Sequence, residues 1–266
     1  MTRIDRAISQ IHSLDDASRA DTPLARVDAR AKVLVTLAFL ITVASFGRHQ
    51  LVEPLPLALP LAIGLALGEV PVGVLGSRLA LTAPFAVLVG IWNPIFETEP
   101  LVRLGPLVLS AGWVSFLSVV ERVLLGVTAV LLLIASTGMD TVATALGRLG
   151  MPRVLVTQLM LLYRYAFLLV EEVSRMLRAH ALRAPDRGRP DWRTVRSLLG
   201  ELLLRSLARA ERVHAAMLCR GFTGELHPVR RARFGARDGV VLAACTGYVA
   251  LVRLVDLPRA IGGLFA

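Results

Sequence analysis

Long apolar runs constrain this chain more than any other feature of its sequence. They lie at residues 31–46, 51–67, 79–96, 123–137 and 240–255 and contain few charged side chains. Soluble domains are about 45–50% apolar, whereas this chain is 55% hydrophobic, with a mean hydropathy of +0.63. Because a helix of about 20 residues crosses the bilayer core, the runs predict five membrane-spanning helices rather than one large soluble core.

Two of these runs contain features that would be unusual in a soluble helix. Pro54 lies in the second run and Pro84 in the third, and membrane helices tolerate proline where neighbouring groups satisfy the freed backbone. An interfacial turn holding Trp113, Glu121 and Arg122 is expected just before the fourth run. The pattern therefore predicts an all-α polytopic fold.

Positive charge is concentrated in one segment. Residues 175–237 hold fifteen arginines and five acidic residues, and this difference equals the whole net charge of +10. Arginine beside apolar spans is typical of the cytoplasmic face of a membrane. No nucleic-acid-binding motif accompanies the charge, so nucleic acid is not an expected partner. Residues 1–30 are polar and do not resemble a signal peptide, so the first run is expected to stay in the protein as a membrane anchor. The N-terminus is expected on the cytoplasmic side.

Three further helices are predicted between the fourth and fifth runs. The first covers 140–149, the second begins at Pro152 and ends before Pro185, and the third follows Asp191, a suitable N-cap, and ends at Gly221. The stretch 154–170 is apolar enough to span. A crossing there would put the arginine-rich segment outside, against the positive-inside rule. We therefore expect it to lie at the inner face of the membrane.

The two long helices share a design. Each carries charged residues at helical spacing along one face and apolar residues on the other. Each also ends on an arginine, Arg183 or Arg220, directly before a break. These arginines suit either helix tips that enter a partner's pocket or caps on helices that bind anionic membrane lipid. The charged faces consist of Arg164, Glu171, Arg175 and Arg178 on the second helix, and Glu201, Arg205, Arg209 and Arg212 on the third.

The sequence offers little support for catalysis. The two cysteines, Cys219 and Cys245, form no ligand cluster, and the five histidines are scattered. A polytopic enzyme such as a lipid-modifying transferase is the alternative, but it would need a set of carboxylates or histidines for a metal. The adjacent pair Glu171 and Glu172 can instead pair with arginines one turn on. No catalytic residue, metal site or cofactor is therefore expected.

Several motifs together resemble the CbiQ and EcfT family. These proteins are the transmembrane components of energy-coupling-factor (ECF) importers, a type of ABC transporter. The motifs extend over nearly the whole chain and are specific in combination. They are Val27-Asp-Ala-Arg-Ala-Lys32 before the first run, Leu149-Gly-Met-Pro152, Tyr163-Arg-Tyr165, Glu171-Glu172, the stretch 205–212, and Ala216-Met-Leu-Cys-Arg-Gly-Phe222.

The resemblance implies a pair of long, crossing cytoplasmic coupling helices. In the family, each tip carries a three-residue motif centred on arginine and docks on one of two ATPase subunits. The matching positions are Leu182-Arg183-Ala184 and Cys219-Arg220-Gly221, and only the second keeps the common glycine. The charges that would support the helices are Arg164, Glu171, Glu172, Arg175, Arg205, Arg209 and Arg212.

The resemblance also implies a function without catalysis. The chain would pass ATP-driven motion to a membrane-embedded substrate-binding subunit, and cobalt or nickel is expected as cargo ahead of a vitamin. Apolar residues on the coupling helices would contact that subunit or pack between the helices: Leu161, Leu168, Met176, Leu203 and Met217. We expect membrane helices 1–4 in residues 1–137, the coupling helices in 138–237 and the last membrane helix in 238–266, in a bacterial inner membrane.

Overall fold

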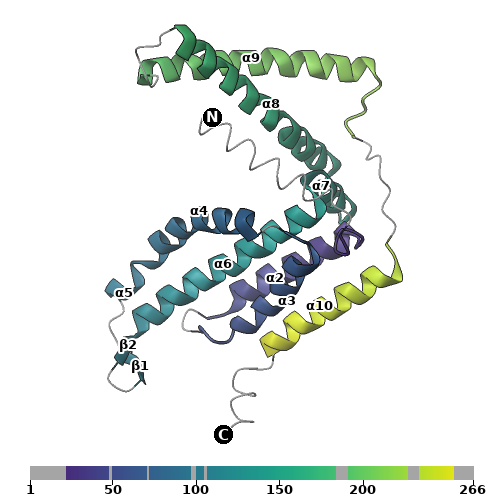
Figure 1. Ribbon diagram of the computed structural model, residues 1–266. Helices are drawn as coiled ribbons and strands as arrows, with labels where there is room; N and C mark the ends of the chain where they lie inside the picture. The colour runs from purple at the N-terminus through teal and green to yellow at the C-terminus, as the bar shows by residue number, and fades with distance from the viewer. Residues whose placement is uncertain are drawn as a thin grey trace. The chain divides into compact units, whose positions relative to one another are not determined.

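The structure is a computed structural model that describes residues 22–47, 50–70, 72–96, 100–104, 107–183, 191–226 and 234–254. The chain divides into two compact units. The bundle unit is described within residues 22–142 and 234–254, and the helix-pair unit within residues 143–226. Figure 1 shows the elements of both units.

The described elements are helices apart from one short hairpin. The bundle unit contains α2 (Ala29–Ser45), η1 (Leu55–Leu57), α3 (Ala58–Leu67), α4 (Val72–Gly90), α5 (Asn93–Phe96), β1 (Pro100–Leu104), β2 (Leu107–Ser110), α6 (Ala111–Thr137) and α10 (Ala236–Leu254). Strands β1 and β2 pair antiparallel. α7 (Met139–Arg148) crosses the unit boundary, and α8 (Arg153–Arg183) and α9 (Trp192–Cys219) form the helix pair. The predicted all-α class is confirmed.

A helix occupies each of the five predicted apolar runs, with two corrections. The predicted turn before the fourth run is wrong, because α6 is one continuous helix from Ala111 and includes Trp113, Glu121 and Arg122. The third run begins too late in the prediction, since α4 starts at Val72, and the run divides into α4 and α5. By length and composition, α6 and α8 are the two described helices long and apolar enough to cross a membrane.

Neighbouring helices of the bundle unit alternate in direction. At the start of α2, the Lys32 ammonium donates to the Ser136 carbonyl near the end of α6, so these helices are antiparallel. The end of α4 lies against the start of α6, where a Cβ at Gly90 would come within 2.8 Å of Phe116. α3 begins near α10, since the Tyr248 hydroxyl donates to the Pro56 carbonyl at 2.9 Å.

α2 and α10, in contrast, run parallel. At their first ends, the Asp28 amide donates to Asp238 Oδ1 at 2.8 Å. At their last ends, Arg253 Nε donates to Ser45 Oγ at 3.0 Å, and its guanidinium lies 5.3 Å from the centre of the Phe46 ring. Contacts at both ends fix the register of the two helices. Figure 1 shows the course of α2 and α10.

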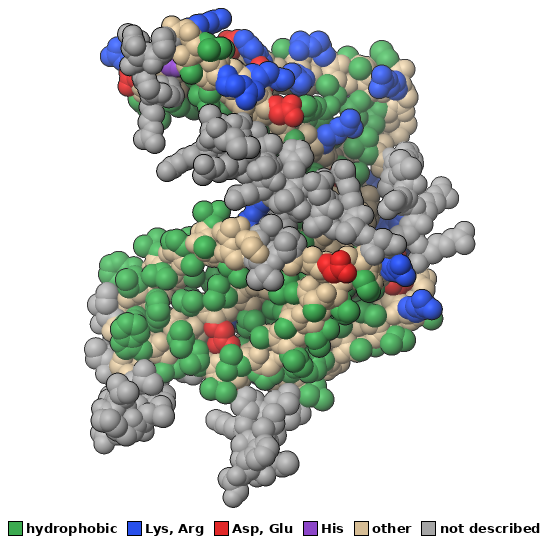
Figure 2. Space-filling view, viewed as in Figure 1, with side chains coloured by type: hydrophobic (Ala, Val, Ile, Leu, Met, Phe, Trp, Pro, Cys, Tyr) green, Lys and Arg blue, Asp and Glu red, His purple; other side chains and the backbone are tan. Residues whose placement is uncertain are grey.

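An apolar core holds the bundle unit together. Much apolar surface also faces outward, and Leu81 is 78% exposed. Figure 2 shows hydrophobic side chains over most of the visible face of this unit. Such a surface suits lipid better than water. The core consists of Phe39, Val43, Phe46, Leu57, Leu61, Leu125, Ala129, Val249 and Val252.

Candidate functional site

Local sequence signals set the bounds of the two long helices. α8 begins directly after Pro152, whose carbonyl accepts from the Val156 amide at 3.3 Å. α9 begins after Asp191, whose carboxylate accepts from the Trp192 amide at 2.7 Å and so caps the helix. The predicted N-cap is therefore confirmed. Pro152 itself lies just outside the helix rather than in its first turn.

The two helices run in opposite directions. The Thr157 hydroxyl, near the start of α8, donates to the Gly224 carbonyl, which follows α9, at 3.1 Å. The side chains of Arg153 and Glu225 form an ion pair at the same end. Thr157 is buried, and this contact ties the end of α9 to the start of α8. The pair is therefore antiparallel.

Glu172 joins the two helices in the middle of the pair. Its carboxylate accepts from Arg175 one turn later at 2.7 Å and from Arg205 of α9 at 3.0 Å. Arg205 also donates to Glu201 at 2.8 Å. The Glu172 side chain is only 15% exposed, whereas its arginine partners are more than half exposed. Hydrogen bonds from Arg175 and Arg205 hold the pKa of the Glu172 carboxyl below its usual range.

The tip of α9 has a defined geometry. The Phe222 amide donates to the Met217 carbonyl and the Gly221 amide to the Leu218 carbonyl, both at 3.0 Å. These two bonds form a Schellman motif, which requires a left-handed residue, and Gly221 supplies it with φ of +78°. Arg220 is the C-cap residue and is exposed. The motif fixes the backbone on either side of the arginine.

The tip of α8 is equally exposed. Arg183 is the last residue of the helix, and Leu182 beside it is 85% exposed. Ala184, the third predicted residue of this motif, lies outside the described residues. Cys219 is exposed at the end of α9. Within the described part of the chain, neither Arg183 nor Arg220 forms an ion pair with a carboxylate.

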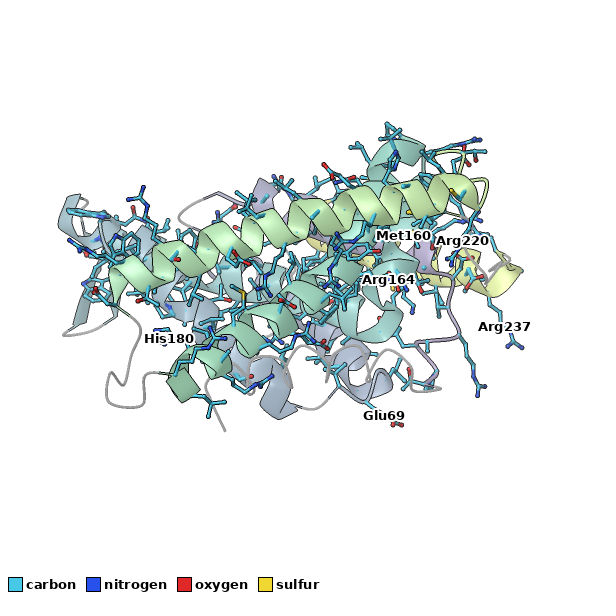
Figure 3. The ribbon with its side chains drawn as sticks, turned by 90° about the horizontal axis from the view of Figure 1, so that it is seen from above. Glu69, Met160, Arg164, His180, Arg220 and Arg237 are labelled. Atoms are coloured by element: carbon cyan, nitrogen blue, oxygen red, sulfur yellow. The ribbon has the colours of Figure 1, made fainter. Side chains whose placement is uncertain are left out.

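The two arginine tips lie at opposite ends of the helix pair. At 1.5 Å rise per residue, Arg183 lies about 16 Å beyond Glu172 along α8, and Arg220 lies about 22 Å beyond Arg205 along α9. Since the helices are antiparallel and meet at Glu172 and Arg205, these distances extend in opposite directions. Figure 3 shows Arg220 at one end of α9 and His180 of α8 toward the other.

A groove of about 510 Å³ runs between α8 and α9. Of the five apolar residues singled out from the sequence, Leu161, Leu168 and Met217 line it, whereas Leu203 is 60% exposed. Glu172, Arg205 and Arg209 also line the groove. None of the residues of α9, all of which the structure describes, is buried. The pair therefore presents extensive apolar surface to its surroundings.

The predicted supporting charges are only partly brought together. Glu172, Arg175, Glu201 and Arg205 form a connected network. Arg164, Glu171, Arg209 and Arg212 make no ion pair within the described residues, although Figure 2 shows Lys and Arg gathered on the visible face of the helix pair. Sequence reasoning missed Thr157 and the pair of Arg153 and Glu225, because these contacts join residues about seventy positions apart with no local pattern between them.

Among the residues that the structure describes, no three His, Cys, Asp or Glu side chains are grouped to hold a metal ion. This finding concerns metal ligands and does not test for enzyme activity. The expectation that the chain is not an enzyme stays a prediction.

The cobalt transport protein family CbiQ matches residues 20–229 of this chain. This range includes the helix pair, both arginine tips and most of the bundle unit. The chain belongs to the CbiQ family. With α6 long and apolar enough to cross a bilayer, it is a membrane protein of a transport family.

Two curated relatives of this CbiQ-family chain are uncharacterized proteins of Methanocaldococcus jannaschii. The first is 29% identical over 147 residues, which is 54% of this chain and 50% of the relative. The second is 31% identical over 106 residues, which is 40% of each. The chain thus matches half or less of the length of these two relatives, and their names assign no activity.

Proposed function

We propose that the chain is the transmembrane coupling subunit of an ECF-type ABC importer. Arg183 and Arg220 would each dock on one of two ATPase subunits, and α8 and α9 would pass ATP-driven motion to a membrane-embedded substrate-binding subunit. The observation that carries this proposal is the antiparallel pair in which each helix ends on an exposed arginine that pairs with no described carboxylate. Family membership supports it independently.

The chemistry of the tips fits this role. Guanidinium is always charged and binds carboxylates through two parallel hydrogen bonds. Neither tip arginine forms an ion pair with a carboxylate of the described residues, so both can bind an acidic groove on a partner. Two tips that face away from each other favour two separate partners rather than one.

The direction of the bundle helices supports five crossings. α2, α3, α4 and α6 alternate in direction, and α10 is parallel to α2. If α8 alone were a further crossing, α10 would be the sixth span and would run antiparallel to α2. If α9 crossed as well, parity would be restored, but five arginines of α9 would then enter the bilayer at high cost. We therefore propose that α8 and α9 both lie on the cytoplasmic side.

Native Cys219 gives a direct test of this topology, because it is exposed at the tip of α9. A membrane-impermeant maleimide applied to a Cys245→Ser variant should label Cys219 in inside-out vesicles and leave it unlabelled in right-side-out vesicles. Labelling from the outside would overturn the cytoplasmic placement of the tip.

Co-purification of the ATPase pair tests the coupling role. The Arg183→Glu, Arg220→Glu double variant should insert normally but lose the ATPases. The matched control is Arg164→Glu, Arg209→Glu, which makes the same charge change at exposed positions between the two tips. The control should keep both ATPases. Retention by the tip variant, or equal loss by the control, would contradict docking through the tips and favour binding of anionic lipid.

We propose cobalt as the cargo on the strength of the family description. Uptake of radioactive cobalt and nickel by cells that express the complete importer tests this choice. Cobalt uptake that depends on Arg183 and Arg220 supports it. Nickel uptake without cobalt uptake would reassign the cargo and leave the coupling role intact.

A further inference from the structure

Three helix ends meet through buried polar contacts in the bundle unit. Asp28 precedes α2, and its amide donates to Asp238 Oδ1 in the first turn of α10 at 2.8 Å. Lys32 of α2 donates to the Ser136 carbonyl at 2.9 Å and to Thr137 Oγ1 at 3.2 Å, both at the end of α6. We call Asp28, Lys32 and Asp238 the clasp. It joins positions 210 residues apart in the chain.

The clasp places buried charges of opposite sign near one another, where a single buried charge would be costly. Asp28 and Asp238 are 6% and 7% exposed. Asp238 accepts a second backbone amide, from Gly235, at 2.8 Å, and Asp28 caps α2 through the Arg30 amide at 2.8 Å. Arg30 Nε also lies 4.0 Å from Asp28 Oδ1. Two carboxylates thus face two cations, so removing one group leaves an unpaired buried charge.

The clasp lies at the end of α6 and the start of α10. α6 ends at Thr137 and is capped by Gly138, which has a positive φ of +77°. The chain continues through α7, whose first residues still belong to the bundle unit, and returns to the bundle at Gly235, whose amide donates to Asp238. The clasp therefore lies at both points where the segment carrying α7, α8 and α9 joins the bundle. The two junctions are held together by side chains rather than by chain connectivity.

We infer that the clasp anchors the coupling helices and stays closed throughout the transport cycle. This inference rests on the proposed coupling function. With the clasp closed, the two junctions of the segment that carries α8 and α9 stay together, and a displacement of these helices moves the bundle. With the clasp broken, the junctions after α6 and before α10 can move apart, and the same displacement no longer moves the bundle helices. Asp28, Lys32 and Asp238 are then positioning residues whose loss lowers the uptake obtained per ATP.

A reversible cross-link across the clasp tests this inference. Asp28→Cys and Asp238→Cys are combined with Cys219→Ser and Cys245→Ser, and the complete importer is reconstituted in liposomes. Cobalt uptake and ATP hydrolysis are measured before and after treatment with a short bifunctional methanethiosulfonate. Before cross-linking, uptake per ATP should fall several-fold, while ATP hydrolysis continues. Cross-linking should restore the ratio, and a reducing agent should abolish the gain.

Two results would overturn the inference. A cross-linked importer that hydrolyses ATP but no longer transports would mean that the clasp opens during the cycle. An unlinked double-cysteine protein with the uptake per ATP of its parent would mean that the clasp has no part in coupling. Each single-cysteine variant serves as a control that the reagent cannot bridge. A parent protein without ATP-dependent uptake would instead refute the proposed function itself.

A milder variant covers the case in which the double-cysteine protein does not assemble. Asp238→Asn keeps an oxygen that accepts from the Asp28 amide but removes the charge that faces Lys32. A purely structural role would lower uptake and ATP hydrolysis together, because fewer complexes would be intact. A positioning role lowers the ratio of uptake to hydrolysis. An unchanged ratio in Asp238→Asn would contradict the inference.

Discussion

The helices inside the bundle unit and the helices inside the helix-pair unit are held together by different kinds of contact. The helices of the bundle unit share an apolar core and are joined at both ends by specific contacts, such as those of Asp238 and Arg253. In the helix-pair unit, α9 has no buried residue and meets α8 through exposed arginines around Glu172. The bundle unit has a buried core of its own, whereas α9 of the helix pair has none of its residues buried.

The same contrast appears in the polar contacts. A buried carboxylate that loses its partner is strongly destabilising, because water cannot replace the lost bonds. An exposed ion pair contributes little, because water screens it and the side chains lose freedom when they pair. We therefore expect sensitivity to polar substitution to be high at the ends of the bundle helices and low along the helix pair.

The largest loss of stability is expected from Asp238→Ala. It removes the acceptors of two backbone amides, Asp28 and Gly235, in a buried place. Leaving one buried donor unsatisfied costs about 1–3 kcal/mol, so the unfolding temperature in detergent should fall clearly. Glu211→Ala, an exposed carboxylate on α9, is the control and should leave the temperature unchanged. Equal shifts in the two variants would remove the difference between the units.

A smaller effect is expected from Gly221→Ala. Nothing lies within 4 Å of a Cβ at Gly221 or Gly200, but only Gly221 has a positive φ. The left-handed conformation costs an alanine about 1–2 kcal/mol, so the tip should rearrange and ATPase co-purification should weaken. Gly200→Ala adds the same methyl group inside α9, where it favours the helix by about 0.5–1 kcal/mol. ATPase binding that changes equally in both variants would show that the tip geometry is unimportant.

The smallest effect on stability is expected from Glu172→Gln. Its exposed arginine partners lose an ion pair that water screens, so the unfolding temperature should not change measurably. The angle between the helices should become less defined. Spin labels at Ala179→Cys and Arg196→Cys, in a background without Cys219 and Cys245, report this as a broader distance distribution. An unchanged distribution would mean that packing alone sets the angle.

The pH dependence of the spin-label distance distribution tests the same contact of Glu172. Arg175 and Arg205 lower the pKa of Glu172, so the contribution of this carboxylate is present at neutral pH. It is lost as the pH falls through that lowered pKa, below the ordinary carboxyl range. The spin-label distribution should therefore stay narrow at neutral and mildly acidic pH and broaden only in stronger acid. Broadening near neutral pH would contradict the lowered pKa.

Much of the helix content could be predicted from local sequence. Apolar runs located the bundle helices, and Asp191 and Gly221 marked the ends of α9. Such signals work because capping and burial depend on residues a few positions apart. The continuity of α6 through Glu121 and Arg122 was missed, because a charged pair inside an apolar helix resembles a boundary. The hairpin of β1 and β2 gave no pattern that we recognised.

The candidate site was predicted less evenly. The two arginine tips and the charged faces follow from helical spacing alone. The contact of Glu172 with Arg205 and that of Asp28 with Asp238 could not be predicted from spacing, because each joins elements far apart in the chain. Asp28 and Lys32 stood out in the sequence only as part of a motif. Their partners on α6 and α10 became evident once the helix ends were placed together.

The parallel course of α2 and α10 has an evolutionary consequence. Because Gly138 ends α6 and Gly235 precedes α10 beside the same buried contacts, the stretch between these glycines starts and ends at one place in the bundle. On the proposed function, recombination at these two glycines would exchange the part that docks on the ATPases without rerouting α2, α3, α4, α6 or α10. The ATPase partner and the substrate-binding partner could then be inherited separately.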